Sequence, residues 1–142
     1  MKHELSAEDR RFQADVEGCR IAAASFDHRS HLRLAYTFLA EHGDDAASAL
    51  MRDTLLRFLA HHAIDPSKYH ETITRAWILA VRHFMAKTPA SPSSDAFIER
   101  NPILLDSKIM LTHYSAELLF SPDARASFVE PDLDPIPRHE PP

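Results

Sequence analysis

The apolar residues between positions 70 and 87 recur every three or four positions, and this spacing constrains the fold more than any other feature. Such spacing places side chains on one side of a helix. The stripe consists of Ile73, Trp77, Ala80, Val81 and Phe84. His70 lies one turn earlier on the same side, so we expect it to face the core. Asp65-Pro66 is a typical helix start, because Asp caps free amides and Pro at the first position loses no hydrogen bond. A long buried helix is predicted from there to Lys87.

Helical spacing continues along most of the chain. It predicts helices near 6–23, 27–42 and 44–62, and shorter ones after Ser94, Asp106 and Ser121. No segment shows strand alternation. We therefore expect an all-α fold: a single-domain bundle of about five or six helices around a four-helix core, comprising residues 1–130.

The chain ends in a proline-rich segment, residues 131–142. Prolines at 131, 135, 137, 141 and 142 exclude both a helix and a central strand there. We expect an extended tail whose inner part, through Leu133 and Ile136, is pinned to the helices. The last five residues, 138–142, should be loose.

Composition excludes several classes of function. Only two glycines occur, and neither belongs to a phosphate-binding loop. The formal net charge of −5 argues against nucleic acid as a partner. Cys19 is the one cysteine, which favours a reducing cytoplasm. No signal-peptide pattern and no apolar run of about 18 residues is present, so we expect a cytoplasmic protein without membrane contact.

Four of the ten histidines occupy favourable positions on the predicted helices. His28 and His31 are three residues apart and share a face. If consecutive helices alternate in direction, His70 and His113 reach the same end of the bundle. Imidazoles bind Zn, Fe, Ni or Cu, and three ligands with an open position suit catalysis. The pattern thus suggests a pocket holding one transition metal, in a metal-dependent hydrolase or an oxygen-using enzyme.

Two familiar metal motifs are absent. His70-Glu71-Thr72-Ile73-Thr74 begins like the zinc-protease helix, but Thr74 replaces its second histidine. No Glu is followed three residues later by His, which argues against a carboxylate-bridged di-iron centre. Any metal site would therefore be mononuclear and histidine-rich.

Three other interpretations use the same residues. Each histidine could instead be a packing residue that donates one N–H to a backbone carbonyl. A metal-free pocket for an anionic small molecule could form beside His70 from basic and aromatic side chains. Its residues would be Arg33, Glu71, Arg75, Trp77, Lys108 and Tyr114. Finally, the broad apolar face of the 27–42 helix could form a homodimer.

Three stretches together resemble a family of small bacterial all-helical proteins to which no activity is assigned. They are Phe26 to Ala35, Tyr69 to Trp77, and Leu105 to Lys108 with His113-Tyr114-Ser115. The resemblance implies a bacterial source and a helical fold, and it implies no chemistry for any residue.

The metal hypothesis predicts near-stoichiometric metal in untagged protein, measured by elemental mass spectrometry. His70→Ala with His113→Ala should abolish that metal content, because imidazole nitrogens would lie about 2.0–2.2 Å from the ion. Protein that stays metal-free after reconstitution with Zn, Fe, Ni and Cu would contradict it.

Overall fold

The computed structural model describes residues 2–139, and within them the regular secondary structure is entirely helical. The α-helices are α1 (Ala7–Glu17), α2 (His28–Glu41), α3 (Asp44–His61), α4 (Glu71–Lys87), α5 (Ser94–Arg100), α6 (Met110–His113), α7 (Ala116–Leu119) and α8 (Pro122–Ala126). Short 3-10 turns are η1 (Ala23–Ser25), η2 (Pro66–Lys68), η3 (Pro102–Leu105) and η4 (Ser107–Ile109). The expected all-α class is confirmed, with more and shorter helices than expected. No helix between residues 2 and 139 is long and apolar enough to cross a membrane.

Local capping explains where most helices begin. Ser6 and Asp9 form a reciprocal capping box at α1, and the Asp27 side chain accepts the Ser30 N–H at α2. The prediction for α4 was wrong in detail. Asp65-Pro66 starts only the turn η2, after which the chain is extended and α4 begins at Glu71. His70 is therefore the N-cap of α4 rather than a residue of its first turn.

Helices α2 and α4 form the centre of the fold. In α2 every residue from Leu34 to Leu39 is buried, and in α4 every residue from Ala76 to Val81 is buried. A helix that is buried all round its circumference has to be enclosed by other elements. Helices α1, α3, α4 and α5 and the turn η3 enclose α2.

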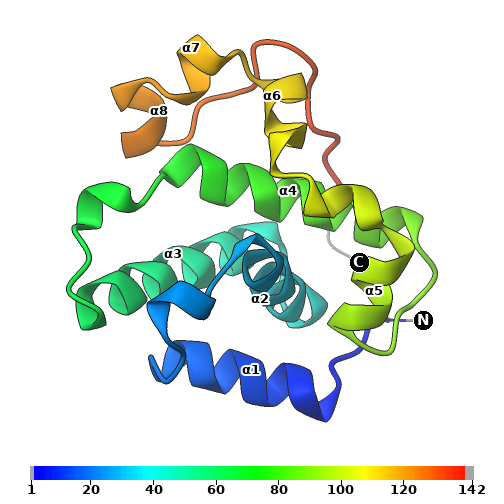
Figure 1. Ribbon diagram of the computed structural model, residues 1–142. Coiled ribbons are helices and arrows are strands. Elements are labelled where there is room, and N and C mark those ends of the chain that lie inside the picture. The colour runs from blue at the N-terminus through cyan, green and yellow to red at the C-terminus, as the bar shows by residue number, and fades with distance from the viewer. Residues whose placement is uncertain (1, 140–142) are drawn as a thin grey trace.

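The helices do not form the bundle that we considered, in which consecutive helices lie side by side and alternate in direction. Figure 1 shows α3 and α4 running in opposite directions, whereas α2 is seen nearly end-on and crosses both. Helices α6, α7 and α8 lie on the other side of α4 from α1, α2 and α3 (Figure 1). Because α2 is inside the chain, its apolar face is not available for the dimer contact that we considered.

A buried carboxylate ties α1 to α2 and α5. Asp9 is 1% exposed and accepts hydrogen bonds from Ser6 N, Ser94 N, Ser94 Oγ and Arg33 Nε. Burial raises the pKa of Asp9, but the hydrogen bonds from Ser94, Ser6 and Arg33 outweigh burial and lower it overall. The carboxylate is thus ionised and fully used in fixing the position of α1.

Residues 131–139 form neither helix nor strand, and they lie against α4 and α6. Ile136 is 5% exposed, as expected, whereas Leu133 is 53% exposed. Leu133 N donates to His113 O, and Asp132 accepts from Ser115 N. Arg138 forms an ion pair with Glu130 and lies over the Phe128 ring. The prediction of a loose end therefore fails at Arg138, and residues 140–142 lie outside the described part.

We predict that Asp9→Ala lowers the free energy of unfolding by about 3 kcal/mol, because it leaves a partly buried Arg33 and two Ser94 donors without their acceptor. Urea denaturation of the full chain measures the change.

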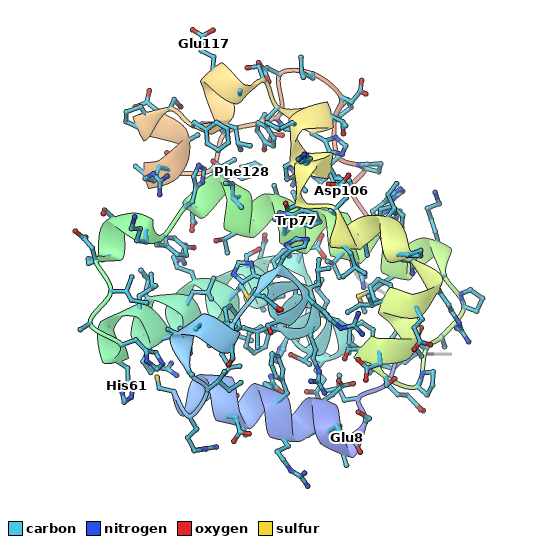
Figure 2. The ribbon with its side chains drawn as sticks, in the orientation of Figure 1. Glu8, His61, Trp77, Asp106, Glu117 and Phe128 are labelled. Atoms are coloured by element: carbon cyan, nitrogen blue, oxygen red, sulfur yellow. The ribbon has the colours of Figure 1, made fainter. Side chains whose placement is uncertain are left out.

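Glu8→Ala is the matched control for that substitution. Glu8 precedes Asp9 in the first turn of α1 and projects into solvent (Figure 2). Its substitution should change the free energy of unfolding by no more than about 0.5 kcal/mol. Equal losses for the two variants would show that the network around Asp9 does not fix α1.

Candidate functional site

Three of the four histidines that we singled out bind backbone carbonyls. His28 Nε2 lies 2.9 Å from Leu104 O, and His70 Nε2 lies 2.7 Å from Leu119 O. His113 Nδ1 lies 2.7 Å from Asp134 O. Each of these imidazoles thus connects its own helix to a different segment: His28 to the turn η3, His70 to the end of α7, and His113 to residue 134. This is the packing role that we considered as the alternative to metal binding.

The hydrogen bonds of His70 determine its tautomer. Its Nδ1 accepts the Ile73 N–H at 3.0 Å, which makes the side chain the N-cap of α4. Nε2 must then carry the proton and donate it to Leu119 O. Burial lowers the pKa of His70, so the neutral form is favoured. Both ring nitrogens are occupied, and neither offers a lone pair to a metal.

His28 and His31 are neighbours, and they lie among aromatic rings. The His28 ring packs against Trp77, which lies where α4 faces α2 (Figure 2), with centroids 4.7 Å apart. The His31 ring packs edge-on to Phe26 at 5.3 Å. Burial, with a smaller effect from His28, lowers the pKa of His31 to about 4. His31 is therefore neutral near pH 7.

The geometry does not assemble a metal centre from these residues. Among residues 2–139, no three His, Cys, Asp or Glu side chains are grouped so that they could hold a metal ion. Binding a metal at His70 would first require breaking its bond to Leu119 or to Ile73. The metal hypothesis stays a prediction, with the elemental analysis above as its test.

The residues of the expected anion pocket are dispersed over the fold. Arg33 is paired with Asp9, and Glu71 accepts from both Tyr69 and Arg52. The other members of that set are Arg75, which pairs with Asp45, the buried Trp77, the exposed Lys108, and Tyr114, whose hydroxyl donates to Val129 O. Glu71 and Arg75 are one turn apart on α4, but each pairs with a residue of α3 instead.

A cleft of about 590 Å³ lies at the junction between α2 and α3, beside the C-terminal half of α4. Its polar lining includes Lys2, His3, His42, Arg82 and His139, and Glu41 is the carboxylate among the described lining residues. Leu39 and Met85 contribute apolar surface. We call this space the basic cleft.

A second cavity of about 360 Å³ adjoins the basic cleft, and the two share Gly43 and His139. It contains Arg75 and Arg138 and also Asp44 and Asp45. Asp44 forms a 3.4 Å ion pair with Arg82, which lines the basic cleft. Burial raises the pKa of Asp44, and the nearby Arg82 partly offsets that rise. We call this space the side cavity.

Little in the sequence indicates the basic cleft. Its histidines come from the N-terminal segment, the end of α2 and the last described residue, and no periodicity links such positions. Arg75, which lines the side cavity, is the member of the expected anion pocket that does lie at this place. The high histidine count was the one available signal.

Comparisons with known proteins add no assignment. No family model, no curated protein and no solved structure matches the chain.

We predict that His70→Ala costs about 1 kcal/mol more stability than His70→Asn. Asn retains an N-cap acceptor for α4, whereas Ala removes the cap as well as the bond to Leu119 O. Urea denaturation at pH 7.5 tests this, and equal costs would contradict the N-cap role.

The His70 variants should also change the pH dependence of stability. Because the pKa of His70 is lowered in the folded protein, the unfolded chain binds its proton more readily below about pH 6.5. The stability that the neutral His70 side chain contributes is fully present above pH 6.5. It is lost as the pH falls below 6.5 toward the lowered pKa of His70. The stability difference between wild type and His70→Asn should therefore shrink from pH 7.5 to pH 5. A difference that does not change with pH would refute this.

Proposed function

We propose that the protein binds a small anionic molecule, a phosphate or carboxylate compound, in the basic cleft. The observation that carries this proposal is the charge of the lining. Lys2, Arg82 and three histidines line the cleft with one carboxylate, Glu41, and Asp44 offsets part of the charge of Arg82 from the adjoining side cavity. The whole chain carries −5, so this gathering of Lys2, Arg82 and imidazoles contrasts with an acidic protein.

The size of the basic cleft fits such a ligand. Small-molecule sites typically measure about 300–1,000 Å³ and combine apolar walls with a few convergent polar groups. The cleft falls in that range at about 590 Å³. The apolar surface of Leu39 and Met85 would contact the carbon skeleton of the molecule.

The polar groups of the cleft differ in how free they are to bind. The Lys2 and His42 side chains make no hydrogen bond or ion pair with other residues in the 2–139 range, so they can reach a ligand without losing a partner. His3 is fixed, because its Nδ1 accepts from Ser91 N and its Nε2 contacts Met85 O. Arg82 is held by Asp44. We assign Lys2 and His42 as the mobile anion ligands, with His3 as part of the wall.

The other two hypotheses are less well supported by the geometry. A metal-dependent enzyme would need donors that are at present bonded to the backbone. A homodimer would need a surface other than α2. Both stay predictions, and the anionic ligand is the function that we put forward.

The proposal predicts saturable binding of inorganic phosphate or citrate to the basic cleft. Titrations followed by amide NMR shifts should show changes at Gly43, Arg82 and the residues near Lys2. The double variant Lys2→Gln, His42→Gln should weaken binding at least about tenfold, since hydrogen bonds to charged groups contribute about 1.5–3 kcal/mol each.

His61→Gln is the matched control. His61 is exposed at the C-terminal end of α3 (Figure 2), whereas the cleft borders the N-terminal end of that helix. An 18-residue helix separates the two ends by about 27 Å. His61→Gln should bind either anion as wild type does. No saturable shift with either anion, or equal weakening in the control, would refute the proposal.

A further inference from the structure

His83 of α4 and His139 are joined by a hydrogen bond that the preceding sections leave without a role. His83 Nδ1 lies 2.8 Å from His139 Nε2. The ring planes are inclined by only 24°, and their centroids are 5.0 Å apart. The ring centroids are farther apart than the two bonded nitrogens. The difference is about twice the distance from the centre of an imidazole ring to its own nitrogen. The two nitrogens therefore face each other nearly head-on.

This geometry is that of a hydrogen bond rather than of a metal chelate. Two imidazoles on one tetrahedral ion point at a common centre beside the line that joins them, and their nitrogens stand farther apart. Head-on nitrogens instead share one proton, with one imidazole donating and the other accepting through its lone pair.

The proton count decides whether the bond exists. A first added proton makes an imidazolium that still donates to a neutral imidazole, so the bond persists and gains charge assistance. A second added proton occupies the accepting lone pair. The bond is then lost, and two cations face each other at close range. Because the two nitrogens share one proton, addition of the second proton is the step that breaks the bond.

The surroundings disfavour a charge on His83, whereas the carboxylate of Asp44 lies near His139. Arg82 and Lys87 flank His83 on α4, and His113 acts on it from α6. Around His139 lie Asp44 from α3, His42, and the N-terminal Lys2 and His3. The other charged residues that line the side cavity are Arg75, Arg138 and Asp45, and Glu41 lines the basic cleft. Glu140 follows in the sequence, outside the described residues.

Position gives this bond a consequence. His139 lines both the basic cleft and the side cavity. Ile136 is buried in the core and holds the preceding part of the tail independently of the histidine pair. Residues 137–139 are therefore the part of the tail that is held by His83 and by the Arg138–Glu130 pair.

We propose that the His83–His139 hydrogen bond is an acid-sensitive latch, which holds residues 137–139 across the boundary between the basic cleft and the side cavity. When both imidazoles are charged, the latch opens and His139 is released, while Arg138 keeps its ion pair with Glu130. The two cavities then join. The latch itself needs no ligand; its effect on anion binding rests on the proposed function.

The direction of the pH dependence follows from the same pair. Burial, with smaller effects from His139, Lys87 and His113, lowers the pKa of His83 below the ordinary value of 6.5. The latch is therefore closed above pH 6.5. It is lost as the pH falls below 6.5 toward that lowered value.

Backbone ¹⁵N relaxation of the ligand-free full chain between pH 7.5 and pH 5 tests the latch. The amide of His139 should change from an order parameter near the rigid value of about 0.85 to the flexible range below about 0.6. The midpoint should lie below pH 6.5. The amide of Ile136 should stay ordered throughout, which shows that the chain remains folded.

Three variants sharpen this experiment. His83→Phe keeps a ring but cannot bond, so His139 should be mobile already at pH 7.5, while Arg138 keeps its ion pair with Glu130. Lys87→Gln removes a charge that disfavours protonation of His83, so the midpoint should move to higher pH. His61→Gln, at the far end of α3, should match wild type. Order that does not change with pH, or an ordered His139 in His83→Phe, would overturn the latch.

A phosphate titration of the same samples separates the two proposals. A tail that loosens with acid while phosphate never binds would leave the latch intact and refute the proposed function. Phosphate binding with a tail that is rigid at every pH would do the reverse.

Discussion

Enclosure of α2 is the constraint on which the rest of the structure depends. A helix with consecutive buried residues from Leu34 to Leu39 has no face left for solvent, so elements from both halves of the chain must surround it. Helix α3 packs against it directly after the sharp turn at Gly43, and α4 returns across it. Helices α1 and α5 close the remaining sides. The Asp9 network secures this closure, because one carboxylate bonds groups on α1, α2 and α5.

The parts of the fold that could be read from the sequence were those set by local chemistry. Asp27 caps α2 as expected, because an N-cap side chain binds a backbone N–H only three residues further along the chain. Asp65-Pro66 gave the same signal but starts only a 3-10 turn. Tyr69 and His70 are extended there, which the local pattern does not reveal. Arg75 lies one turn along α4 from Glu71, yet Tyr69 and Arg52 bind the two carboxylate oxygens of Glu71. Arg52 is distant in sequence, and helical spacing says nothing about such a partner.

The histidines show the same limit at the candidate site. The spacing of His28 and His31 correctly placed them together, but it could not show that His28 is bonded to Leu104 O. His3 and His139 approach the same cleft from opposite ends of the chain, and only the folded backbone brings them there. A recurring use is nonetheless clear. An imidazole can donate from one nitrogen while the other accepts, so a single side chain can connect two separate segments, as at His70 and His3.

The tyrosines follow a similar logic, and this has a practical consequence. The hydroxyl of Tyr36 donates to Glu4 O, that of Tyr69 to Glu71, and that of Tyr114 to Val129 O. These are the three tyrosines of the chain, and burial raises the pKa of each of them. Phenolate cannot form in the intact protein near pH 10, where exposed phenols ionise. The ultraviolet absorbance of phenolate in alkali would therefore record loss of the native fold, so this protein carries its own optical reporter of unfolding without any added dye.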